Sequence, residues 1–177
     1  MTRNIQGPGR TQPSSKIKKP GFYASTVAHS SATDEWATPQ STFDAINTEF
    51  EFGLDVCALQ SSAKTINWYG PDHTDHTRLD GLEQDWTGDA QGSTIWMNPP
   101  YGTTIGKWMH KAVEETNKGA TVVCLLPVRT DTRWFQDTVL ALQQQDRAEI
   151  RFIRGRLKFG NARTGAPFPS AIVVLKP

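Results

Sequence analysis

The stretch GATVVCLLPVR, residues 119–129, is an apolar run of the kind found at the centre of a protein core. A strand whose two faces are both covered by helices has such a run, whereas a strand with one face in water alternates. Helical patterns flank it, because residues 103–118 repeat apolar side chains at helical spacing and residues 130–145 form a second helical stretch. A buried strand between two helices predicts an α/β protein with a mostly parallel sheet.

The rest of the chain continues this alternation. A helix is expected over residues 39–50, strands over 52–58, 64–70 and 93–98, and a polar loop over 71–92. Three further strands follow one another without an intervening helix, at residues 148–155, 156–161 and 169–176. Strands joined in this way usually pair as antiparallel neighbours. The sequence therefore predicts a three-layer α/β sandwich whose mostly parallel sheet ends in an antiparallel hairpin.

Charge is distributed unevenly along the 177 residues, although the formal net charge is only +1. Residues 1–20 hold five basic side chains and no acidic one, and residues 147–163 hold six basic side chains and one acid. We expect residues 1–30 to form a flexible basic arm and residues 31–177 to form a single domain. The two basic regions favour a polyanionic partner such as nucleic acid; the alternative is an ordinary solvated surface.

The sequence also predicts where the protein resides. Cys57 and Cys124 both lie in apolar runs, which is typical of reduced cysteines in a protein core. No apolar run approaches the ~20 residues of a membrane span, and the basic N-terminal residues are not followed by the apolar segment of a secretory signal. We therefore expect a cytoplasmic protein with no membrane partner.

The motif Asn-Pro-Pro-Tyr, residues 98–101, follows an expected strand directly. Two consecutive prolines fix the backbone and remove two N–H donors, which gives a stiff loop whose carbonyl groups lack local partners. Ligands bind at the carboxyl ends of the strands in open α/β sheets. Asp55, residues 98–101 and residues 127–129 all follow strands, so we expect a binding site where they meet.

The order of these motifs is similar to that of a known family. The segments DEWATP, LDVCA, DGLEQDW, IWMNPPYG, LLPVRTDTRWF, IRGRLKFG and APFPSAIVV resemble the DNA N-6-adenine-methyltransferase family of phages and prophages. The resemblance runs from about residue 34 to the last residue. It implies a Rossmann-like methyltransferase sheet, double-stranded DNA as partner, S-adenosylmethionine as cofactor, and methyl transfer to the N6 amine of adenine. A phage-encoded enzyme of this kind would act in the cytoplasm of the host cell.

The resemblance assigns catalysis to Asn98, Pro99, Pro100 and Tyr101. The exocyclic amine of adenine is a weak nucleophile because its lone pair is delocalised into the ring. Hydrogen bonds from this amine to the side-chain carbonyl of Asn98 and the backbone carbonyl of Pro99 would localise the lone pair and aim it at the sulfonium methyl. Tyr101 would stack on the base once it has been flipped from the duplex.

The resemblance assigns part of the cofactor site to the end of the first strand. Asp55 ends this strand, and Cys57 and Ala58 stand where many nucleotide-binding folds have glycines. Asn98 is expected to contact the cofactor as well as the substrate. The alternative for Asp55 is a purely structural role.

Two further pairs of residues complete the expected cofactor site. Thr38 and Pro39 resemble an element that meets the methionine carboxylate, and the alternative is a plain helix cap. Asp85 resembles the acid that accepts from the adenine amine of the cofactor, with Trp86 at the border of that pocket. The alternative for Asp85 is an ordinary loop position.

Five basic residues are expected to bind DNA. Arg129 and Arg133 flank the end of the central strand, while Arg154, Arg156 and Lys158 alternate with apolar residues, so that one face of their segment would be charged. Such a face suits DNA phosphates. The alternative is a solvated edge kept soluble by its charges.

Other functions remain open at this point. The segment DHTDHTRLD, residues 72–80, has no tetrahedral metal-ligand spacing, so we expect a polar surface loop and no metal. The first alternative is a methyltransferase that acts on an amine or amide of RNA or protein, because an Asn-Pro-Pro-Tyr loop also occurs in such enzymes. The second alternative is a catalytically inactive DNA-binding relative, because the glycine-rich loop is absent.

Overall fold

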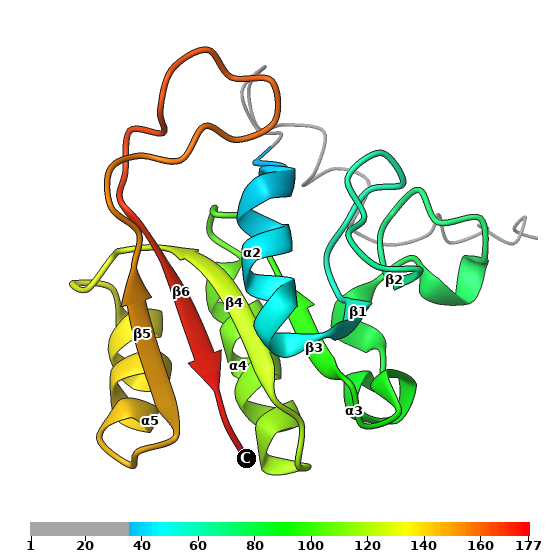
Figure 1. The fold of residues 1–177 in the computed structure, drawn as a ribbon. Coiled ribbons are helices and arrows are strands. Elements are labelled where there is room, and N and C mark those ends of the chain that lie inside the picture. The colour runs from blue at the N-terminus through cyan, green and yellow to red at the C-terminus, as the bar shows by residue number, and fades with distance from the viewer. Residues whose placement is uncertain (1–35) are drawn as a thin grey trace, which may run out of the picture.

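Six strands form one mixed sheet in the order β2-β1-β3-β4-β6-β5 (Figure 1). The computed structural model describes residues 36–177, so the expected basic arm over residues 1–30 lies outside the described residues. The strands are β1 (Phe52–Asp55), β2 (Asn67–Trp68), β3 (Thr94–Met97), β4 (Val122–Pro127), β5 (Ala148–Phe152) and β6 (Ser170–Leu175). The first four are parallel neighbours, whereas β6 lies antiparallel between β4 and β5. The expected antiparallel pair at the end of the sheet is confirmed.

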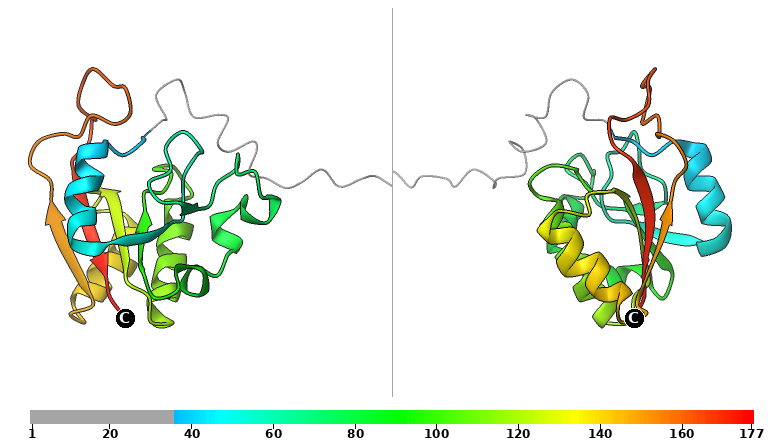
Figure 2. Two further views of the ribbon diagram at one scale, coloured as in Figure 1. Left: turned by 45° about the vertical axis from the view of Figure 1, so that its right-hand side comes forward. Right: turned by 90° about the vertical axis from the view of Figure 1, so that its left-hand side faces the viewer.

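Helices cover both faces of this sheet, as the right-hand view of Figure 2 shows. The helical elements are α2 (Gln40–Phe50), the 3-10 turns η1 (His76–Arg78) and η2 (Gly81–Glu83), α3 (Trp86–Ala90), α4 (Ile105–Asn117), the π-helical η3 (Phe135–Leu140) and α5 (Ala141–Gln143). Helix α2 packs on one face, which we call the α2 face. Helices α3, α4 and α5, together with η3, pack on the other, the α4 face.

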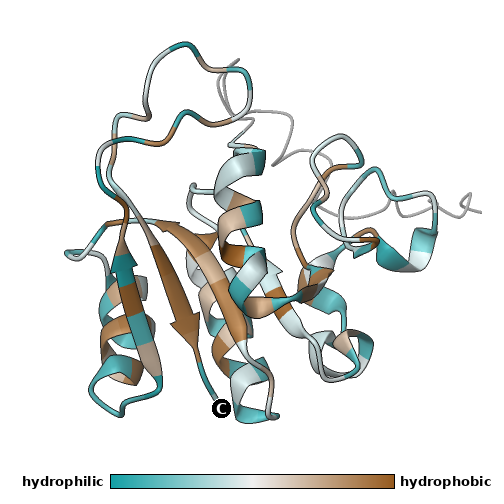
Figure 3. Ribbon diagram, viewed as in Figure 1, coloured by the Kyte–Doolittle hydropathy of each residue, from teal (hydrophilic) through white to brown (hydrophobic). Residues whose placement is uncertain are grey.

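The central strand β4 is buried along its whole length, as the apolar run at 119–129 predicts. Figure 3 shows this strand coloured as largely hydrophobic. Val123 and Leu125 point to the α2 face and join Phe43 of α2, while Cys124 and Leu126 point to the α4 face. Burying an aliphatic side chain of this size contributes about 1.5–3 kcal/mol. Both helix layers are therefore held by the same strand.

Two sequence expectations for secondary structure are wrong. The expected strand over 156–161 is irregular: Gly160 donates its N–H to Ala37 and Leu157 accepts from Ala166, so no ladder forms. Position 160 also has a positive φ of 50°, which breaks extended backbone. The segment 153–169 instead folds over the α2 face as a long connection between β5 and β6.

The stretch 71–92 is also more ordered than a polar loop. Its acids satisfy backbone donors: Asp72 accepts from Gln60, and Asp75 accepts from Thr77 at the start of η1. Helix α3 also lies within this stretch, and its first residue, Trp86, is fully buried in the core. Among residues 36–177, no helix is long and apolar enough to cross a membrane.

Candidate active site

Asn98 follows the last residue of β3 and lies at the edge of the sheet where the parallel strands end. Side chains alternate across a strand, and here Trp96 packs on the α2 face while Met97 packs on the α4 face. The side chain of Asn98 therefore continues on the α2 face. Asp55 on the neighbouring strand β1 pairs in register with Trp96, so its side chain points to the α2 face as well.

The amide of Asn98 is held in one orientation. Its Nδ2 donates to the backbone carbonyl of Trp36 at 2.7 Å and lies 3.1 Å from the hydroxyl of Thr38. A backbone carbonyl only accepts, so the amide nitrogen must face Trp36 and the oxygen must face away. Oδ1 is then turned toward Tyr101, whose hydroxyl lies 2.8 Å away. One lone pair of this oxygen remains for a further donor.

Tyr101 belongs to an aromatic cluster formed by Trp36, Tyr101, Phe159 and Phe168. Its ring is stacked with Trp36 at a centroid distance of 6.1 Å and meets Phe159 and Phe168 edge-on at 5.9 and 5.5 Å. Burial raises the pKa of Tyr101 well above its usual value, so its hydroxyl stays protonated. The cluster joins the loop after β3, residues 98–101, to the segment 153–169, whose irregular path brings both phenylalanines here.

The two prolines of the loop differ in exposure. Pro99 is buried and Pro100 is exposed. Among residues 36–177, no N–H or O–H group donates to the carbonyl oxygen of Pro99. An oriented amide oxygen and an unpaired carbonyl oxygen therefore occupy successive residues at the end of β3.

Thr38 and Pro39 lie directly beside Asn98. Thr38 is buried, and its hydroxyl accepts from the Asn98 amide instead of capping the helix. Helix α2 begins at Gln40 with Pro39 at the capping position, so the expected Thr38 cap is wrong. The N–H groups of Gln40 and Ser41 have no acceptor within residues 36–177. They leave the positive end of the α2 dipole open at the site.

Asp55 is almost fully buried, with 2% of its surface exposed. Its oxygens accept the backbone N–H groups of Cys57 at 3.3 Å and Lys64 at 3.1 Å, which closes the loop after β1. Burial raises the pKa of Asp55 to about 6 in spite of these hydrogen bonds. The carboxylate stabilises the loop that carries Cys57 and Ala58.

The loop after β1 packs closely on the residues that follow β2. The N–H of Ala58 donates to the carbonyl of Tyr69 at 2.9 Å. A Cβ atom at Gly70 would lie 1.8 Å from the carbonyl oxygen of Ala58, so only glycine fits there. Burial, followed by the charges of Asp55 and Asp80, raises the pKa of the Cys57 thiol well above its usual value. This cysteine is a neutral thiol and a poor nucleophile.

The structure places Asp85 away from Asn98. Its carboxylate is exposed and pairs with Lys118 at 3.2 Å, just beyond the last residue of α4. Helix α4 starts near the catalytic loop, and its 13 residues carry the chain about 18 Å from there to the opposite edge of the sheet. Trp86 is fully buried, and its indole donates to the carbonyl of Gly81 at 2.6 Å. Neither side chain lies at the strand ends with Asn98.

Asp80 lies closer to the strand ends and is an acid that sequence reasoning missed. Its charge acts on the Cys57 thiol, and a Cβ atom at the adjacent Gly81 would lie 2.2 Å from the carbonyl oxygen of Val56. The side chain of Asp80 also accepts from the N–H of Leu82. In the sequence the only sign of this is the glycine that follows Asp80, since its close approach to Val56 requires the fold. Within residues 36–177, no group of three or more His, Cys, Asp or Glu side chains could hold a metal ion.

The five basic residues expected to bind DNA are exposed, and none forms an ion pair within the described residues. They are Arg129, Arg133, Arg154, Arg156 and Lys158. Two other arginines of the basic region behave differently. Arg151 forms ion pairs with Glu49 and Glu149, and Arg147 donates to Asn117.

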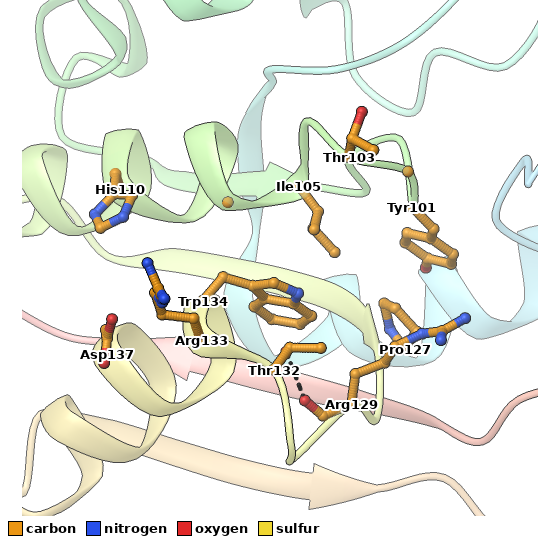
Figure 4. Close-up of a pocket in the computed structure, with 12 residues that line it drawn as sticks. Tyr101, Thr103, Ile105, His110, Pro127, Arg129, Thr132, Arg133, Trp134 and Asp137 are labelled. Carbon is orange, nitrogen blue, oxygen red and sulfur yellow. Dashed lines mark hydrogen bonds between the residues drawn. The ribbon is translucent and has the colours of Figure 1, made fainter.

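A cavity of about 620 Å³ lies beside the catalytic loop on the α4 face (Figure 4). It opens between the start of α4 and the residues that lead into η3. Its lining consists of Tyr101, Gly102, Thr103, Ile105, Gly106, His110, Pro127, Arg129, Thr132, Arg133, Trp134 and Asp137. Of these residues, sequence reasoning placed Tyr101, Pro127, Arg129 and Arg133 at a site, whereas helical spacing assigned Ile105 to the core.

The fold and the loop define an α/β protein with a methyltransferase-like organisation. The sequence profile of the DNA N-6-adenine-methyltransferase (Dam) family matches residues 25–173, and the chain belongs to this family. A protein of Haemophilus phage HP1 (strain HP1c1) named DNA N-6-adenine-methyltransferase is 33% identical over 135 residues, which cover 75% of this chain and 69% of the relative. A protein of the same name from Escherichia phage T1 is 24% identical over 136 residues, which cover 76% of this chain and 51% of the relative.

Proposed function

We propose that this protein transfers a methyl group from S-adenosylmethionine to the N6 amine of adenine in DNA. The observation that carries the proposal is the geometry after β3, where the Asn98 amide oxygen is oriented and the Pro99 carbonyl oxygen is unpaired. Two acceptors on a rigid loop match the two N–H groups of an exocyclic amine. Family membership selects adenine in DNA from the amines that such a loop can serve.

The chain's own residues act by positioning and electrostatics. Asn98 and Pro99 accept hydrogen bonds from the amine, which draws its lone pair out of the ring. S-adenosylmethionine, when bound, would supply an electrophilic methyl group on its sulfonium and would leave as a neutral thioether. The amine held by Asn98 and Pro99 would lose one proton to solvent as it gains the methyl group.

The residues at the strand ends fit this cofactor in two respects. The free N–H groups of Gln40 and Ser41, at the positive end of α2, suit the carboxylate of its methionine part. Asp80 is close enough for its charge to act on the Cys57 thiol, and its carboxylate suits hydrogen-bond donors of the nucleoside part. We therefore assign the acidic partner to Asp80 in place of Asp85, and we assign Trp86 an indirect role through Gly81.

The arrangement of layers supports a Rossmann-like sheet. Helices lie on both faces, and the proposed site lies where the parallel strands β1, β3 and β4 end. The unpaired cations Arg129, Arg133, Arg154, Arg156 and Lys158 are proposed to contact the phosphates of double-stranded DNA. Modification of viral DNA is the role that fits phage relatives.

The test is methylation of unmethylated duplex DNA with isotopically labelled S-adenosylmethionine. The DNA is digested to nucleosides and analysed by mass spectrometry, with Asn98→Ala beside wild type. Asn117→Ala is the matched control because Asn117 lies at the far end of α4. Labelled N6-methyladenine with wild type and Asn117→Ala, and none with Asn98→Ala, is the expected result.

Two other results would replace the proposal. Cofactor binding in calorimetry without methylated DNA would direct the search to amines of RNA or protein. Absence of both product and cofactor binding would identify a DNA-binding relative without activity.

A further inference from the structure

The cavity beside Tyr101 has the chemistry of a nucleotide subsite. The ring of Tyr101 and the side chains of Ile105 and Trp134 form its apolar walls (Figure 4). Arg129 and Arg133 stand at its rim, and neither forms an ion pair within residues 36–177. An aromatic surface beside free guanidinium groups suits a base and its phosphate.

Gly102 and Gly106 line this cavity, and neither position requires a glycine for close packing. A Cβ atom at Gly106 would meet only the Cβ of Trp134, at an ordinary contact distance of 3.6 Å, and one at Gly102 would meet nothing within 4 Å. Neither residue has a positive φ. Gly106 lies in the first turn of α4, where glycine costs about 0.5–1 kcal/mol relative to alanine. The fold itself would therefore tolerate a small side chain at either position.

The cavity is not where the reacting amine would meet Asn98. The Asn98 amide lies on the α2 face, between Trp36 and Thr38, whereas the cavity lies on the α4 face. The side chain of Tyr101 stands between them, because its ring lines the cavity and its hydroxyl contacts Asn98. A base in the cavity is separated from the Asn98 oxygen by this tyrosine.

We infer that the cavity binds a nucleotide next to the methylated adenine, with its base against Trp134 and its phosphate at Arg129, because Arg133 lies on the other side of Trp134 (Figure 4). The inference rests on the proposed function, since it assumes a DNA strand at the catalytic loop. The cavity volume of about 620 Å³ accommodates a nucleotide. Contacts there would make methylation depend on the base beside the target.

Filling the cavity tests this inference. Gly106→Leu places an aliphatic side chain beside Trp134, and Gly106→Ala adds a single methyl group that favours the helix. Glu114→Leu is the matched control because Glu114 is exposed on the same helix, away from the cavity. Each variant methylates a library of duplexes with random bases around adenine, and sequencing gives the preference at each flanking position.

Wild type and Glu114→Leu should share a preference at one position beside the methylated adenine. Gly106→Leu should reduce that preference at least fivefold and raise KM for DNA about tenfold, because it removes the stacking of one base on an aromatic side chain. Its kcat should stay within about twofold of wild type. Gly106→Ala should give a smaller change in the same direction. Unchanged preferences and KM in Gly106→Leu would overturn the inference. A loss of kcat with unchanged flanking preferences would place the reacting adenine in the cavity instead.

Photochemical crosslinking gives a readout that does not need turnover. Duplex DNA with 5-bromodeoxyuridine at its thymine positions is irradiated with the protein, and the crosslinked peptide is identified by mass spectrometry. The expected crosslink lies at Trp134 and is lost in Gly106→Leu, whose fold is checked by thermal melting. Crosslinks only at surface residues outside the cavity would overturn the inference. If wild type makes no N6-methyladenine but crosslinks at Trp134, the proposed reaction fails while the subsite stands.

Discussion

The hydroxyl of Tyr101 lies 2.8 Å from the amide oxygen of Asn98. The same hydroxyl lies 3.0 Å from the carbonyl oxygen of Leu125 on β4. A hydroxyl has one proton to donate, so it serves one of these two acceptors at a time. Rotation of the proton toward Leu125 frees both lone pairs of the Asn98 oxygen without moving the ring. The Asn98 oxygen proposed to accept from adenine thus keeps one free lone pair, and rotation of the hydroxyl proton frees the second.

Tyr101→Phe tests this relationship because it removes the hydroxyl and keeps the ring. We expect the free energy of unfolding to fall by about 1 kcal/mol, since the Leu125 carbonyl loses a buried donor. The kcat should stay within about threefold of wild type, because Asn98 keeps its contacts to Trp36 and Thr38. Urea unfolding and single-turnover methylation measure the two quantities. A much larger loss of kcat, equal to that of Tyr101→Ala, would show that the hydroxyl itself is needed.

Thr38→Val should lower kcat about fivefold, since one hydrogen bond that orients the Asn98 amide is worth about 1 kcal/mol. Thr38→Ser retains the hydroxyl and should restore kcat to near the wild-type value. Steady-state methylation of duplex DNA at saturating cofactor measures both. If the serine variant is as slow as the valine variant, the methyl group of Thr38 matters and its hydroxyl does not.

Asp55 makes stability depend on pH. Burial raises its pKa to about 6, so it favours the folded state below the unfolded pKa of 3.8, and this contribution is lost as the pH rises through 6. We expect Asp55 to destabilise the protein by roughly 1–3 kcal/mol at pH 7.5 relative to pH 4. Asp55→Asn should lack this part of the pH dependence in urea titrations. Equal slopes for the two proteins between pH 4 and pH 7.5 would contradict the assignment.

Glu115 has the opposite dependence. Its carboxylate is buried between α3 and α4, where it accepts from Thr87 and pairs with Lys111 and Lys118 at 2.8 Å. Burial opposes ionisation, but these partners outweigh it and lower the pKa to about 2. Its stabilisation is present above the unfolded pKa of 4.5 and is lost as the pH falls through 2.

Glu115→Gln should therefore lower the free energy of unfolding at pH 7 by roughly 1–3 kcal/mol. Glu114→Gln is the matched control, since the adjacent Glu114 is exposed, and it should change stability by less than about 0.5 kcal/mol. Thermal and urea unfolding at neutral pH measure the difference. Equal stability of the two variants would mean that solvent screens the ion pairs of Glu115.

Removal of one free cation should weaken DNA binding and its dependence on salt. Arg156→Gln is expected to reduce the slope of log K against log salt by about one, as for one lost phosphate contact. Arg151→Gln is the control because Arg151 is already paired with Glu49 and Glu149. Fluorescence anisotropy with a labelled duplex between 50 and 200 mM salt gives both slopes. A similar slope in the two variants would remove Arg156 from the DNA surface.

Local patterns predicted the elements that carry the site. The helical spacing of α4 reflects one buried face and the unbroken apolar run of β4 reflects burial of both faces, so both positions were predictable. Residues 156–161 alternate in the same way, and Phe159 is indeed buried, but the chain reaches that position without forming a ladder. Alternation reports burial of every second residue, and a strand is only one way to achieve it.

Contacts across long sequence distances were not predictable. Asn98 depends on Trp36 and Thr38, which precede it by about 60 residues, and no periodicity connects them. The ion pair of Asp85 was not predictable for the same reason, because only the fold of α3 brings Asp85 to Lys118. The residue types indicated the chemistry of the site. The contacts that hold these residues in place could be identified only from the three-dimensional structure.

The position of β6 has a consequence for the order in which the protein can be assembled during translation. β6 is the last strand along the chain, yet it lies between β4 and β5 and is the neighbour through which β5 joins the sheet. Until the ribosome has released residues 170–175, β4 presents an open apolar edge and β5 has no partner, and such edges are prone to aggregation. We expect nascent chains arrested before residue 170 to be captured by chaperones or degraded, because the middle of the sheet is completed last.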